Sequence, residues 1–177
     1  MSQTRPTVFE VIVKTIVTHT VTYFILGLLA STFIDYTRFF ADSSLNLMMR
    51  QTNNPWVMAG PLFQPIRGML FGCIFYFLRE PFFGKKNGWF LMWIVLVVIG
   101  IIGTFGPTPG SLEGMLYTVF PLWVHLRGLP EGLLQSLSLS LILFYWVNNP
   151  QKRWLNWIMG IAFLVLMSFP IIGLLVG

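Results

Sequence analysis

The feature that most constrains this chain is a series of apolar runs of about 20 residues, each bounded by charged residues, proline or asparagine. Because about 20 helical residues cross a hydrocarbon core roughly 30 Å thick, runs of this length predict membrane-spanning helices. The chain is 55% hydrophobic and only 10% charged, whereas soluble domains carry about 25% charged residues. Too few polar side chains remain to cover a soluble fold. We therefore predict an all-α fold, a polytopic transmembrane helix bundle that forms a single integral membrane domain.

About five spans are predicted. They cover residues 11–33, 56–78, 89–105, 130–147 and 154–176. The first run is longer than the core of a cleavable signal peptide, which has roughly 7 to 15 residues, so we interpret it as a retained span. The fourth begins at Pro130 and Glu131, because proline fits the first helical position and an acidic side chain favours a helix N-terminus.

Residues 106–129, between the third and fourth spans, do not have the pattern of a crossing. Their apolar part, residues 115–126, would extend only about 18 Å as a helix. Four of residues 106–110 are Gly or Pro, and Ser111 can cap a following helix. We predict a re-entrant or interfacial outer segment that packs against the spans, because irregular backbone at membrane depth needs partners from protein or water. The sequence leaves open whether this segment crosses the membrane.

The basic residues indicate an orientation. Seven of them lie in the N-terminal part and in the loops 79–88 and 148–153: Arg5, Lys14, Arg79, Lys85, Lys86, Lys152 and Arg153. Three lie at the opposite ends of the runs: Arg38, Arg50 and Arg127. Since basic loops stay on the cytoplasmic side, we predict a cytoplasmic N-terminus and an outer C-terminus, in a bacterial inner (plasma) membrane. This pattern explains the net charge of +5 by topology, so no nucleic-acid partner is predicted.

Polar residues within and beside the runs identify a candidate ligand site. Gln64 and Arg67 are three residues apart and share one helical face in the second span. An arginine at that depth needs a carboxylate, free carbonyls or a ligand, and Pro65 predicts a kink that frees a carbonyl nearby. The predicted ligand-binding residues, all on the outer side, are Gln64, Arg67, Glu113, His125 and Glu131. The alternative is structural: Arg67 pairs with one internal acid, and Glu113 and Glu131 stabilise helix N-termini.

Two further features concern packing. His19 lies within a threonine-rich stretch of the first span, and we interpret it as a neutral packing residue hydrogen-bonded to a Thr or Gln. Gly68 and Gly72 have the spacing that lets two helices approach closely, in the same chain or in another.

No common catalytic motif is present, and Cys73 is the single cysteine, so neither a metal site nor a cofactor is predicted. The best functional prediction is the binding of an amphiphilic or anionic ligand, such as a membrane lipid, in an outer-side polar pocket. One alternative is a structural or interaction subunit of a homo-oligomer or a larger membrane complex. Another is an intramembrane enzyme acting on a lipid-like substrate, with Glu113 or Glu131 and His125 as acid and base. The sequence does not decide whether the protein is an enzyme.

Overall fold

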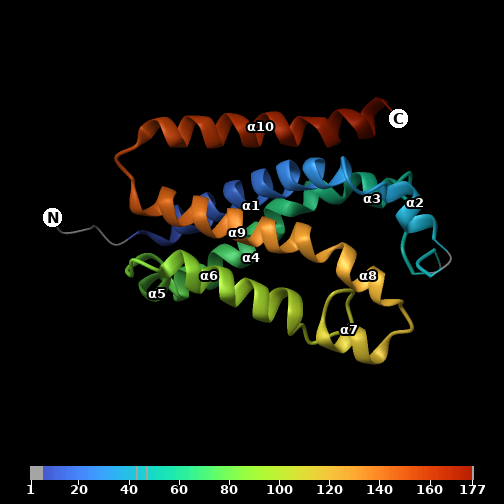
Figure 1. Ribbon diagram of the computed structural model, residues 1–177. Helices are drawn as coiled ribbons and strands as arrows, with labels where there is room; N and C mark the ends of the chain where they lie inside the picture. Colours follow the sequence, from blue (N-terminus) through green and yellow to red (C-terminus); the bar gives the residue numbers. More distant parts are fainter. Residues whose placement is uncertain (1–5, 43, 47, 177) are drawn as a thin grey trace.

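The computed structural model describes residues 6–42, 44–46 and 48–176, and every regular element in these ranges is a helix (Figure 1). The prediction of an all-helical chain is thereby confirmed for the described residues. In chain order the elements are α1 (Val8–Ser31), α2 (Tyr36–Ala41), α3 (Pro55–Ala59), the 3-10 helix η1 (Gly60–Phe63), α4 (Gln64–Phe77), α5 (Arg79–Phe83), α6 (Gly88–Val97), the π-helix η2 (Val98–Ile102), α7 (Leu112–Tyr117), α8 (Leu122–Arg127), α9 (Leu129–Asn148) and α10 (Arg153–Val176).

Five helical runs alternate in direction along the molecule: α1, α3 to α4, α6 with η2, α9 and α10 (Figure 1). Their ends lie within three residues of the five runs expected from the sequence. The start of α1, α5 and the connection from α9 to α10 lie at one end of the molecule, and α2, α7 and α8 lie at the other (Figure 1). Arg5, one of the basic residues used to predict the orientation, lies outside the described residues.

Three of the helices are long and apolar enough to cross a membrane: Val8–Ser31, Pro55–Phe77 and Arg153–Leu174. The apolar helix Gly88–Ile102 is shorter, and at 1.5 Å per residue it extends only about 22 Å. The 20 residues of α9 are long enough, but they include Glu131, Gln135 and several serines. Length and composition thus support three of the five expected spans.

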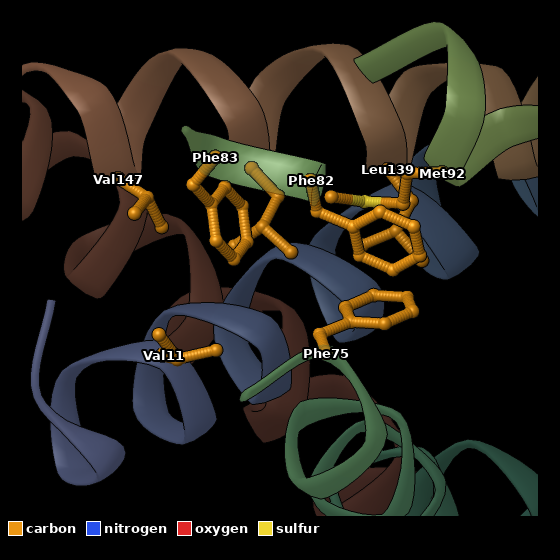
Figure 2. Close-up of a cluster of buried hydrophobic side chains, with 8 residues drawn as sticks. Val11, Phe75, Phe82, Phe83, Met92, Leu139 and Val147 are labelled. Atoms are coloured by element: carbon orange, nitrogen blue, oxygen red, sulfur yellow. The ribbon is translucent and has the colours of Figure 1, made fainter. Parts of the chain in front are cut away.

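Helix α1 is central, because it packs against α4, α9 and α10. A buried apolar cluster joins its first turns to α4, α5, α6 and α9 (Figure 2). The cluster consists of Val11, Phe75, Phe82, Phe83, Met92, Leu139, Leu143 and Val147. By contrast, the outward face of α10 exposes large apolar side chains along its length, including Trp157 and Leu164, as a lipid-facing helix does.

The glycine pair in α4 packs against α1 of the same chain. A Cβ atom added to Gly68 would lie 2.8 Å from the Ile16 Cα, and one added to Gly72 would lie 2.8 Å from the Ile12 Cα. The backbones of α1 and α4 therefore approach so closely that a side chain at position 68 or 72 would collide with α1. This contact identifies the partner helix that the sequence left open.

Residues 106–129 form the two short helices α7 and α8 at the end of the molecule. Ser111 caps α7 as expected, because its Oγ accepts the Gly114 N–H at 2.9 Å. Helix α8 contacts α9, so part of this segment packs against a predicted span. Val119, within the segment, is 98% exposed, and Phe105, just before it, is 99% exposed. The re-entrant or interfacial placement of the segment stays a prediction.

Candidate functional site

A half-open pocket of about 80 Å³ lies between α1, α4, α6 with η2, and α9. This volume exceeds the 10 to 15 Å³ that one water molecule needs, so the pocket has room for a small polar group. Its lining residues are His19, Arg67, Phe71, Leu96, Gly100, Ile101, Gly132, Gln135, Ser136 and Leu139. Four polar side chains from three helices thus converge on a mainly apolar cavity, which is the usual composition of a ligand site.

The pocket owes part of its space to the π-helix η2. Gly100 lies in the middle of η2, and no atom lies within 4 Å of the position that its Cβ would occupy. Across the pocket, a Cβ on Gly132 of α9 would contact the Ile101 side chain at 3.3 Å. Single π turns inside helices are frequent at functional sites. Here the π turn and the missing side chain keep one wall of the pocket open.

Arg67 is the charged residue of this pocket, and it lies near the middle of the candidate membrane helix Pro55–Phe77. Its side chain is exposed, and its guanidinium carbon lies 5.4 Å from the centre of the Phe71 ring. Within the described part of the chain, Arg67 forms no ion pair and donates no hydrogen bond. The alternative in which Arg67 pairs with one internal acid therefore has no such pair among these residues.

None of the outer-side carboxylates pairs with Arg67 among the described residues. Asp35 pairs with Arg38 at 3.2 Å and caps α2. Glu131 accepts a hydrogen bond from the Tyr36 hydroxyl through Oε2. Glu113 lies in the first turn of α7. The Arg67 guanidinium therefore lines the pocket without a carboxylate partner among the described residues.

His19 lines the pocket and is 1% exposed. Its Nε2 lies 3.2 Å from the Gln64 Oε1, which confirms a Gln partner for this histidine. An amide oxygen only accepts, so Nε2 carries the proton. Gln64 begins α4 directly after the 3-10 helix η1, at the break expected near Pro65. Gln64 therefore orients a pocket residue from behind and does not itself line the pocket.

Glu131 precedes the pocket residue Gly132 by one residue in α9, and it does not itself line the pocket. Besides its bond from Tyr36, its Oε1 lies 3.9 Å from the position that a Cβ on Gly27 of α1 would occupy. Burial, and then the hydrogen bond to Glu131, raise the pKa of Tyr36 above its ordinary value of 10.0. The Glu131 carboxylate thus packs beside the backbone of α1 at Gly27 and bonds with Tyr36.

The other two predicted residues lie away from this pocket. His125 is buried in α8, where its Nδ1 accepts the N–H of Gly110 at 3.2 Å, and Gly110 has a φ of +90°. Neither His125 nor Glu113 lines the pocket, and no described hydrogen bond or ion pair joins them to Arg67. The five-residue site expected from the sequence therefore splits. Arg67 lines the pocket and Gln64 bonds to its lining residue His19, whereas Glu131 bonds with Tyr36 beside α1, and Glu113 and His125 belong to the α7–α8 segment.

The predicted ligand-binding residues did not include Tyr36, Gln135 and Ser136. Gln135 follows Glu131 by one helical turn, so the i, i+4 pattern pointed to it. Tyr36 follows α1 in a connecting segment, and no pattern in the sequence indicates its contact with α9.

Among the described residues, no three His, Cys, Asp or Glu side chains gather in a way that would hold a metal ion. No protein-family model, curated protein or solved structure matches this chain. The functional argument therefore rests on the pocket and its residues.

Proposed function

We propose that this chain is a small polytopic membrane protein whose pocket binds an anionic amphiphile, such as a lipid headgroup, through Arg67. The observation that carries this proposal is an arginine without a counterion near the middle of a candidate membrane helix. An unpaired charge at the centre of a bilayer costs about 3 kcal/mol or more. A bound anion offsets that cost, so the protein and its ligand stabilise each other.

The pocket chemistry suits a phosphate or a carboxylate. A guanidinium presents five N–H donors in a planar fork that matches either group in a bidentate fashion. Gln135 adds an amide, while Phe71 and Leu139 offer apolar walls to the adjoining part of an amphiphile. Because the pocket is half-open, a ligand has a route to Arg67 from the surface.

The proposal includes five crossings, with the N-terminus in the cytoplasm of a bacterial cell and the C-terminus outside. Its support is the alternating direction of five helical runs, which puts the start of α1 and the end of α10 at opposite ends (Figure 1). The basic loop residues Arg79, Lys85, Lys86 and Lys152 fall at the end where α1 begins. In this arrangement, α7 and α8 lie at the outer interface with their exposed apolar side chains in the lipid boundary.

Lipid retention tests the proposal directly. The full chain is extracted in a mild detergent, and bound phospholipid is measured by native mass spectrometry for wild type, Arg67→Gln and Arg50→Gln. Arg50 is exposed outside the helices, so its variant loses the same charge away from the pocket. We expect Arg67→Gln to lower retention about tenfold, since charge-assisted hydrogen bonds contribute about 1.5 to 3 kcal/mol. Equal retention by Arg67→Gln and Arg50→Gln, with both variants folded, would refute the role of Arg67.

A subunit of a larger assembly is the second candidate, because Phe105, Leu116 and Val119 expose apolar surface beside α7 and α8. An interface with another membrane protein would cover these side chains. Gentle extraction separates the two functions. A defined partner that co-purifies, and that is lost when Phe105 and Val119 become serine, favours the subunit, whereas a lipid-loaded monomer favours the binding protein.

A further inference from the structure

The open side of the pocket lies between α4 and η2. The lining residues on α1 and on the far part of α9 are closed off, since His19 and Leu139 are both buried. Among all the lining residues, Arg67 on α4 and Gly100 on η2 are the two exposed ones, and the others are buried or half-buried. Because lining residues are exposed where no neighbouring helix covers a cavity, α4 and η2 form the two sides of the mouth.

The packing of the helices explains this opening. Helix α1 packs against α4 and α9, and α6 packs against α9, whereas no packing of comparable extent joins α4 to α6 or η2 in the described residues. Near α5, the buried cluster holds α4 and α6 together through Phe75 and Met92 (Figure 2). Toward the other end, α6 diverges from α1, and α10 lies on the opposite side of α1 (Figure 1). Helix α10 therefore does not cover the mouth.

The rim of the mouth is apolar. Arg67 is the only charged residue in α4, α6 and η2. Leu70 and Ile74 follow it by three and seven residues on the same face of α4, and both are exposed, as is Ile99 on η2. A water-soluble anion would have to lose its hydration to pass this apolar rim. A lipid in the bilayer already lies against it.

Resting on the proposed function, we infer that a membrane phospholipid enters the pocket sideways from the bilayer, between α4 and η2. Its phosphate accepts hydrogen bonds from Arg67, which has no carboxylate partner among the described residues. One acyl chain then lies along the exposed face of α4, past Phe71 toward Ile74, which is about 10 Å from Arg67 along the helix axis. The unpaired guanidinium requires an anion, and the apolar rim requires a hydrocarbon chain. The ligand is thus a lipid of the bilayer and not a free phosphate compound.

Photolabelling from the acyl chain tests this route. The full chain is reconstituted in phosphatidylcholine nanodiscs with a small fraction of phosphatidylglycerol that carries a diazirine midway along one chain. After illumination, tandem mass spectrometry maps the labelled residues. We expect the label around Phe71 and Ile74 to exceed the label on the exposed face of α10 about tenfold, the preference that charge-assisted hydrogen bonds to one phosphate provide. Arg67→Gln should lower it to the α10 level, and Arg50→Gln should keep the wild-type pattern.

The outcomes separate this inference from the proposed function. Equal labelling of α4 and α10 in wild type overturns the lateral route, even if Arg67→Gln still loses lipid in the detergent assay. Equal lipid retention by Arg67→Gln and Arg50→Gln in that assay overturns the proposed function itself. An excess of soluble glycerol phosphate tests the aqueous source. Unchanged labelling of α4 supports entry from the bilayer, whereas loss of this labelling overturns it, because an anion from water would then reach Arg67.

Discussion

Replacing Gly72 with valine tests the close contact between α1 and α4 that positions the pocket. A Cβ on Gly72 would lie 2.8 Å from the Ile12 Cα and 3.3 Å from the Ile12 carbonyl oxygen. Ordinary contacts of a Cβ begin at 3.4 Å, so α4 would have to move away from α1 by about 0.6 Å. The Ile12 atoms in the way belong to the backbone, so no side-chain rotation can relieve the clash.

The expected cost follows from this clash. Extra carbons in a packed interior destabilise a fold by about 1 to 3 kcal/mol, and valine recovers only a few tenths of a kcal/mol over glycine in helix propensity. We therefore expect Gly72→Val to lower the free energy of unfolding by about 2 kcal/mol. In a chain of this size such a loss lowers the melting temperature by roughly 4 to 8 °C.

Thermal unfolding in detergent, followed by tryptophan fluorescence, measures this effect. The matched control is Gly160→Val in α10, because no atom lies within 4 Å of the Cβ position at Gly160. The control should melt within about 2 °C of wild type, since surface changes usually stay within about 0.5 kcal/mol. If Gly72→Val melted together with Gly160→Val, the proposed backbone contact between α1 and α4 would be absent.

Further predictions concern the cap, the pocket, a titrating tyrosine and the topology. Ser111→Ala removes the N-cap of α7, worth about 1 kcal/mol, so amide exchange there should accelerate about fivefold; an unchanged rate contradicts the cap. Gly100→Leu should fill the pocket and abolish lipid retention, and retention at the wild-type level contradicts the open wall at Gly100. Because the folded state raises the Tyr36 pKa, it binds more protons than the unfolded state above pH 10.0. The resulting stability is present below pH 10.0 and falls as the pH rises, and Tyr36→Phe should lack this fall. A reporter at the C-terminus should be outside, and a cytoplasmic reporter contradicts five crossings.

The helices were predictable because their signals are local. Ser111 caps α7 and Pro130 occupies the first turn of α9, as the sequence indicated. The apolar runs predicted where the helical runs lie, since hydrophobic length is visible without any partner, and three of these helices are long and apolar enough to cross a membrane. The π turn at Gly100 was not predictable, because residues 98–102 are as apolar as the helix before them and only packing reveals the change.

The site was predictable only in part, because its contacts join residues far apart in the chain. Arg67 was recognisable, since a charge inside an apolar run is costly in itself. Its lack of a carboxylate partner was not, because Glu131 bonds with Tyr36, 95 residues away. The sequence placed His125 and Arg67 on the same side, but α8 holds His125 against Gly110 instead. Two residues predicted on the same side of the membrane can therefore belong to separate sites, as His125 and Arg67 do.

A structure of the full chain in bilayer nanodiscs that contain zwitterionic and anionic phospholipids tests the central proposal most directly. The account predicts a lipid phosphate in the pocket, about 3 Å from the Arg67 guanidinium. An empty pocket, with Arg67 paired to a carboxylate of the protein, would contradict it.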